Sequence, residues 1–297
     1  MNELNSAQNG MESGGKNIKN RIENKFARLK EENKKAFIPF VMTGDPDLDT
    51  TYRVVLEMIE RGAAVVELGV PYSDPSAEGP VIMRADDRAL QKGVRLKDVM
   101  NIAVRVREKD NSTPLVLLLY FNCIFCYGSE RFFAACEEAG IDGVIIPDLP
   151  YEERDEIAEF AKRHQIIIIS MVTPASRERA KKIAAKAKGF LYCVSSLGVT
   201  GERAEFSTDF AGFFTELNSY SSVPKAIGFG VSSPEQASYL KDYCDGVIVG
   251  SAIVRRIEEE AEKGGDGGKI AKEIGRYTEE MCAALSLPRE KQREVKL

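Results

Sequence analysis

Two glutamates stand where an apolar run meets the loop that follows it. Glu67 lies in the run AAVVEL at residues 63–68, and Glu78 lies in the following loop, VPYSDPSAEGP. Burial disfavours the charged form of a carboxyl group and raises its pKa toward neutrality, which suits acid/base catalysis. We therefore predict that Glu67 does acid/base chemistry, with a buried ion pair that holds a loop as the structural alternative. Glu78 fits a catalytic group and a solvated loop charge equally well.

The composition excludes the usual metal chemistry. The chain has a single histidine, His164, so no zinc or iron site with two or three histidines is possible, and we expect no metal and no cofactor. His164 follows a polar helical stretch, as a solvated helix-end side chain would. The six cysteines lie mostly in apolar segments. Cys123 and Cys126 form a close pair, but no second pair exists to complete a zinc site.

Two glycine-containing loops predict a phosphate site. GFGVSSPEQ (228–236) and GSAIV (250–254) each complete or follow an apolar run. Gly230 and Gly250 allow the backbone to approach a ligand closely, and Ser251 would open a helix whose unpaired N–H groups attract an anion. Ordinary turn glycines are the structural alternative.

The elements that must position these residues repeat along the chain. Short apolar runs typical of buried strands alternate with polar stretches that have helical periodicity, which predicts an α/β fold of the (β/α)8 TIM-barrel type. Active sites of such barrels lie at the carboxyl ends of the strands, where the residues above would meet. The expected strands are 36–42, 63–68, 115–120, 143–147, 166–170, 190–194, 225–229 and 245–250, and the expected helices are 48–61, 81–109, 129–139, 151–164, 176–188, 209–220, 234–242 and 251–285. The glycine-rich stretch 264–268 is expected to divide the last helical region in two.

The chain ends and the overall charge complete this picture. Residues 1–17 are rich in Asn, Gly and Ser and are expected to be a disordered extension, whereas residues 18–290 are expected to form one barrel domain. Ile18, Ile22, Phe26 and Leu29 recur at helical spacing and predict an extra N-terminal helix that covers the core.

The net charge is −5, and no signal-like or membrane-length apolar run appears. We therefore expect no nucleic-acid or membrane partner and a cytoplasmic location. The segment 195–209 is long for a connection and suggests a lid or a contact surface.

Several of these segments carry a family resemblance. FIPFVMTGDPD, ELGVPYSDPSAEGP, SLGVTG, GFGVSSPEQ and VGSAIV occur in this order, and together they resemble the tryptophan synthase alpha chain. The resemblance runs from about residue 22 to residue 260. It implies a lyase that splits indole-3-glycerol phosphate into indole and glyceraldehyde 3-phosphate.

The chemistry of that reaction agrees with the residues available. Cleavage of a carbon–carbon bond requires an electron sink, usually a lysine Schiff base or a metal. Lys225 would lie at the wrong end of its strand for a Schiff base, but an indole ring protonated at C3 supplies its own sink. The resemblance assigns the acid/base role to Glu67 and places Glu78 at the family's catalytic aspartate, beside the ring nitrogen. Glu78 is a departure that keeps the charge and adds a methylene group; we expect activity to be retained.

The resemblance also implies binding residues and a partner. The phosphate would be held by Gly201, Gly230, Gly250 and Ser251, and the pocket would be lined by Phe40, Tyr120, Tyr192, Thr200 and Phe229. From the residues alone, the aromatic side chains would be core residues. The expected partner is the pyridoxal-phosphate-dependent beta chain, in an alpha2-beta2 complex, with loop positions such as Asp74 near it. Two alternatives stay open: a stand-alone indole-glycerol-phosphate lyase, and a catalytically weak subunit that mainly activates the beta chain.

Overall fold

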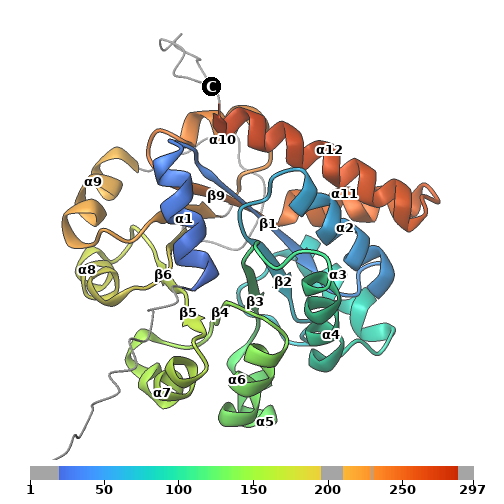
Figure 1. Cartoon of the computed structure of the whole chain (residues 1–297), viewed down its shortest axis with the longest axis horizontal. Coiled ribbons are helices and arrows are strands. Elements are labelled where there is room, and N and C mark those ends of the chain that lie inside the picture. Colours follow the sequence, from blue (N-terminus) through green and yellow to red (C-terminus); the bar gives the residue numbers. More distant parts are fainter. Residues whose placement is uncertain (1–19, 195–209, 229, 287–297) are drawn as a thin grey trace, which may run out of the picture.

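The structure is a computed structural model of the chain and describes residues 20–194, 210–228 and 230–286. Nine strand segments form one parallel sheet in the order β5-β4-β3-β2-β1-β9-β8-β7-β6, so the first and last strands are neighbours. Helices surround the strands (Figure 1). The strands are β1 (Ala36–Met42), β2 (Val66–Gly69), β3 (Leu115–Leu118), β4 (Gly143–Ile145), β5 (Ile167–Ile168), β6 (Ser170–Val172), β7 (Leu191–Val194), β8 (Lys225–Gly228) and β9 (Gly246–Val249).

The predicted eight-stranded barrel is confirmed, with its fifth strand in two pieces. Only Ile169 separates β5 from β6, and its N–H donates to the Val144 carbonyl at 2.9 Å. The first piece pairs with β4 and the second with β7. The fifth strand therefore connects its two neighbours in the barrel, β4 and β7. It covers residues 167–172 rather than the expected 166–170.

The helices agree with the expected regions, with two differences. The expected helix 81–109 is two helices, because the chain turns at Gly93, whose φ of +74° is in the left-handed region. A short helix, α5, was not expected, since its residues continue the apolar run of β3. The helices are α1 (Arg21–Glu31), α2 (Leu48–Glu60), α3 (Pro80–Gln91), α4 (Leu96–Arg107), α5 (Phe121–Tyr127), α6 (Ser129–Glu138), η1 (Tyr151–Glu153), α7 (Asp155–Arg163), α8 (Arg177–Lys186), α9 (Phe210–Tyr220), α10 (Pro234–Leu240), α11 (Ser251–Glu262) and α12 (Gly267–Ser286). Helix α11 ends before the glycine-rich stretch and α12 begins within it, at Gly267, so the last helical region is divided in two, as predicted.

The extra N-terminal helix lies across the amino-terminal end of the barrel (Figure 1). Asn20 caps α1 by accepting the Ile22 N–H, and its amide donates to the carbonyls of Asp142 and Gln165 at 2.9 and 3.0 Å. Ile22 and Phe26 are buried, and the Phe26 ring packs 5.5 Å from that of Phe190. The predicted stripe thus covers the barrel core; Ile18 and the extension 1–17 lie outside the described residues.

The core fills the barrel and leaves its carboxyl end for a site. One cluster of buried side chains, which includes Ile38, Val116, Ile145 and Ile248, fills the interior, and a larger cluster lies between the strands and the outer helices. Because α1 covers the amino-terminal end, the loops at the carboxyl ends of the strands form the open face. In the described part of the chain, no helix has the length and apolar character needed to cross a membrane.

Candidate functional site

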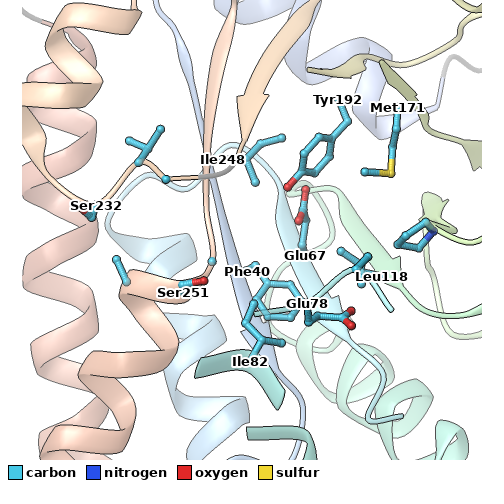
Figure 2. Close-up of a pocket in the computed structure, with 16 residues that line it drawn as sticks. Phe40, Glu67, Glu78, Ile82, Leu118, Met171, Tyr192, Ser232, Ile248 and Ser251 are labelled. Atoms are coloured by element: carbon cyan, nitrogen blue, oxygen red, sulfur yellow. The ribbon is translucent and has the colours of Figure 1, made fainter. Parts of the chain in front are cut away.

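A pocket opens at the carboxyl end of the barrel (Figure 2). It contains about 770 Å³ of unfilled space, part of it open to solvent, which is the size of a small-molecule site. Its walls are mostly apolar, and a few polar groups converge on it. The apolar wall includes Phe40, Ile82, Leu118, Met171 and Ile248, and the polar groups include Glu67, Glu78, Ser232 and Ser251.

Glu67 is a buried carboxyl group without a partner. It lies on β2 in register with Phe40 of β1 and is 1% exposed. Neither carboxyl oxygen has a hydrogen-bond partner among the described residues. Burial raises the pKa of Glu67 to about 8, so the group is protonated at neutral pH. Since no described cation pairs with it, the structure gives no support to the ion-pair alternative. Figure 2 shows the Tyr192 hydroxyl and the Glu67 carboxyl pointing toward one another.

Glu78 reaches the same pocket from the loop after β2. Its Oε2 accepts a hydrogen bond from the Tyr120 hydroxyl, and that hydroxyl accepts the Ala77 N–H at 2.9 Å. Burial raises the pKa of Glu78, and the bond from Tyr120 opposes that rise. Glu78 is therefore a half-buried, held carboxyl group and not the solvated loop charge that the sequence left open. Pro80 follows it as the first residue of α3.

A third carboxyl group, Asp86, stands behind this loop and was missed by the sequence analysis. It lies on α3, is 2% exposed, and its Oδ1 accepts the Tyr72 N–H at 3.0 Å. Burial raises its pKa to about 7. A signal was present, because residues 82, 85, 86 and 89 fall on one face of the helix and the other three are apolar.

Two further acidic residues at this face have structural partners. Asp45 is buried and forms two hydrogen bonds with the Arg88 guanidinium, at 2.7 and 2.8 Å, and Arg88 also pairs with Glu258. Asp148 accepts the Phe121 N–H at the start of α5. These contacts tie the loops around the pocket together, which leaves Glu67 and Glu78 as the acidic groups that line it.

The loops after the seventh and eighth barrel strands form the opposite wall. Gly230, with a φ of +85°, Gly250 and Ser251 all line the pocket. Gly250 is the N-cap of α11 and Ser251 its first residue, and no side chain caps this helix end. The first N–H groups of a helix carry partial positive charge and bind anions well. The predicted residues Gly201, Thr200 and Phe229 lie outside the described residues.

The predicted aromatic residues take two different places. Phe40 and Tyr192 line the pocket, whereas Tyr120 acts on it through Glu78. Two glycines give the lining rings their space. A Cβ on Gly69 would lie 2.6 Å from the Phe40 ring, and one on Gly228 would lie 2.5 Å from the Tyr192 ring. The apolar wall from Leu118, Met171 and Ile248 was not predicted, because strand residues of this kind look alike in sequence whichever side they face.

The remaining candidates lie away from the pocket. Lys225 begins β8 at the opposite end of the barrel, and its ammonium group donates to the Ser221 carbonyl. His164 is the C-cap of α7 and contacts Glu137 at 2.7 Å. The site therefore combines a neutral buried acid, a second carboxyl group, a helix N-terminus suited to an anion, and apolar walls suited to a flat ring.

Known proteins resemble this chain over most of its length. The family model described as the tryptophan synthase alpha chain matches residues 26–283. The tryptophan synthase alpha chain of Caldanaerobacter subterraneus subsp. tengcongensis is 49% identical over 258 residues, which cover 87% of this chain and 97% of the relative. That of Thermoanaerobacter sp. strain X514 is 47% identical and is covered over its whole length by 90% of this chain.

Solved structures agree. The tryptophan synthase alpha chain of Legionella pneumophila subsp. pneumophila superposes with a TM-score of 0.80 at 34% identity, covering 90% of this chain and 97% of that chain. A chain of Mycobacterium tuberculosis tryptophan synthase superposes with a TM-score of 0.80 at 31% identity, covering 91% of this chain and all of that chain. The barrel is thus shared with solved members of one family.

Proposed function

The chain belongs to the tryptophan synthase alpha chain family, and on that premise we propose how its pocket carries out the family's reaction. The chain is a lyase that cleaves indole-3-glycerol phosphate to indole and glyceraldehyde 3-phosphate. The stand-alone lyase and the weak activating subunit are not favoured by these comparisons.

Glu67 is the acid and base of the reaction. The observation that carries this role is its buried carboxyl group, which lines the pocket with both oxygens unpartnered and a pKa of about 8. A protonated Glu67 donates to indole C3, which makes the ring an iminium-like electron acceptor. The resulting Glu67 carboxylate takes the proton of the hydroxyl group on the substrate's glycerol chain. The bond between indole C3 and that chain then breaks, and the bonding electrons return to the ring. Indole and an aldehyde result, and Glu67 ends with its proton regained.

Glu78 stabilises the positive charge that develops on the ring. As a carboxylate, it would accept a hydrogen bond from the indole N–H, where a negative charge is worth most in an apolar pocket. The bond from Tyr120 favours this ionised form. The additional methylene relative to the family's aspartate is accommodated by that bond, which holds the longer side chain in one place.

The phosphate is bound on the opposite wall. Gly230, Gly250 and Ser251 present backbone and a helix N-terminus there, and Gly201 would complete the grip. Phe40 and Tyr192 contact the indole-glycerol part, and Thr200 and Phe229 are proposed to line the same space. The apolar wall between the two ends suits the indole ring, so the ligand spans the pocket from Glu78 to Ser251.

The family implies a beta chain as partner, and we propose an alpha2-beta2 complex. The structurally similar chain from Mycobacterium tuberculosis belongs to a structure of tryptophan synthase. The face that surrounds the pocket supports docking here. Phe125 on α5 is 73% exposed and its ring lies 6.5 Å from that of Phe121, while Asp74 is exposed on the loop after β2. Co-purification with a beta chain and the mass of the complex would test the stoichiometry; a one-to-one complex that does not dimerise would contradict it.

The deciding assay measures indole release from indole-3-glycerol phosphate, with and without a beta chain. Wild type and Glu67→Gln are compared, and far-UV circular dichroism confirms that the variant is folded. We expect turnover in the wild type and none above background in Glu67→Gln. A fully active Glu67→Gln would show that the acid/base assignment is wrong.

A further inference from the structure

The buried Asp86 carboxyl group is not used by the mechanism above. It lies on the inner face of α3, and its Oδ1 accepts the Tyr72 N–H at 3.0 Å. Its Oδ2 is buried and has no hydrogen-bond partner among the described residues. An unpaired buried carboxyl oxygen costs stability, so its presence points to a role other than holding the fold together.

A continuous series of contacts joins Asp86 to Glu78. Asp86 holds the backbone of Tyr72, and the Tyr72 ring stacks on that of Tyr120 at 4.7 Å between centroids and 19° between planes. The Tyr120 hydroxyl donates to Glu78 and accepts the N–H of Ala77, the residue before Glu78. Both ends of the loop segment 72–78 are therefore fixed against the same pair of rings.

The charges around Asp86 make the two carboxyl groups dependent on each other. Burial is the main cause of the raised pKa of Asp86, and the charges of Glu78, Asp87 and Asp45 raise it further. Asp45 is paired with Arg88 and Asp87 is exposed, which leaves the half-buried Glu78 as the neighbour whose charge is not neutralised by a cation. An ionised Glu78 therefore favours the protonated form of Asp86, so Asp86 holds Tyr72 without adding a second negative charge beside Glu78.

We propose that Asp86 is a positioning residue for Glu78. It accepts the Tyr72 N–H, and through the stack of the Tyr72 and Tyr120 rings it holds the loop that carries Glu78. This inference rests on the proposed role of Glu78 and names a residue on which that role depends. Asp86 does not touch the substrate in this account.

The pH profile of kcat for Asp86→Asn tests the charge. Asparagine keeps an oxygen to accept the Tyr72 N–H and is neutral, like the protonated carboxyl group. We therefore expect kcat near the wild-type value and no displacement of the acid limb where Glu78 ionises. Asp87→Asn, at the neighbouring exposed position, is the matched control and should also leave the profile unchanged. Loss of the Glu67 proton should set an alkaline limb of the same profile, and that limb should not move in either variant, which provides an internal reference.

Asp86→Ala tests the contact. Without an acceptor for the Tyr72 N–H, we expect kcat to fall about tenfold. KM should change by less than about threefold, because the proposed phosphate-binding residues are on the opposite wall of the pocket and are not altered. Thermal unfolding shows whether both Asp86 variants are folded. Wild-type kcat in Asp86→Ala would overturn the inference, and so would an Asp86→Asn variant that is as slow as Asp86→Ala. Glu78→Gln in the same assay separates the two proposals. If it is inactive, the role of Glu78 stands even when the inference about Asp86 is overturned. If it is fully active, the proposed role of Glu78 is wrong, and the inference about Asp86 falls with it.

Discussion

Glu67 and Phe40 are register partners on adjacent parallel strands, so a carboxyl group and an aromatic ring stand side by side at one level of the barrel. The ring helps to keep water from the carboxyl group, and burial raises the pKa of Glu67 to about 8. The barrel thus prepares a neutral acid at neutral pH by apolar packing, and neither oxygen of that carboxyl group has a hydrogen-bond partner among the described residues.

Replacing Glu67 with glutamine is expected to separate activity from stability. The amide cannot transfer a proton, so kcat for indole release should fall by about 10²–10⁴. The free energy of unfolding at neutral pH should stay the same or rise, because no charge has to be kept out of the buried site. Steady-state indole release and urea unfolding measure the two effects. A variant that loses stability as well as activity would show that the carboxyl group has a structural partner.

The stability of the wild type should fall as pH rises. Glu67 keeps its proton up to about pH 8 in the folded chain but loses it near 4.5 when unfolded. Between these values the folded state binds more protons, so the unfolding free energy decreases by up to ~1.4 kcal/mol per pH unit. Asp86 acts in the same direction between 3.8 and about 7.

Urea unfolding of the wild type and Glu67→Gln across this range checks the sign. The unfolding free energy of the variant should exceed that of the wild type by an amount that grows from about pH 5 to about pH 8. The difference should vanish in acid, where Glu67 is protonated in both the folded and the unfolded wild-type chain. Parallel stability curves across the range would contradict a raised pKa for Glu67.

Glu78→Asp tests whether the longer side chain is used. Aspartate would pull the carboxylate away from the Tyr120 hydroxyl, to which Glu78 is bonded, and we expect kcat to fall about tenfold. Tyr120→Phe removes the same hydrogen bond while keeping the glutamate, so its loss should be similar. If Glu78→Asp were faster than the wild type, the departure from the family's aspartate would be a cost and the Tyr120 bond would not compensate for it.

The sequence predicted the barrel and the burial of Glu67 because both leave local signals. Alternating apolar and polar runs indicate the strands and helices, and a glutamate between valines and a leucine indicates burial. The contacts around Glu78 leave no such signal, because Tyr72, Tyr120 and Asp86 come from three separate segments. Asp86 is a polar residue on an apolar helix face, which could have been noticed. The division of the fifth strand at Ile169 depends on its two different neighbours, β4 and β7, and no local pattern records that.

Ser251→Asp is expected to stabilise the fold while it prevents binding. A carboxylate in the first turn of α11 meets the positive end of the helix and should raise the unfolding free energy by about 0.3–1 kcal/mol. The same charge lies where the phosphate is proposed to bind, so KM should rise at least about tenfold, with repulsion as the cause. Ser251→Ala serves as the control and should change both quantities little. An unchanged KM in Ser251→Asp would place the phosphate elsewhere.

Phe26→Ala should affect stability and leave the chemistry intact. Phe26 is 4% exposed on α1 and packs against Phe190 at the amino-terminal end of the barrel, opposite the pocket. Removing the ring leaves a cavity, and we expect the unfolding free energy to fall by about 3–5 kcal/mol. At temperatures where the variant is folded, kcat and KM should equal the wild-type values, because Phe26 lies at the opposite end of the barrel from the pocket. Lys30→Ala on the exposed face of the same helix is the matched control. A lower kcat in folded Phe26→Ala would show instead that the packing of α1 is transmitted through the barrel interior to Glu67, because Ile38, Val116 and Ile248 connect the two ends.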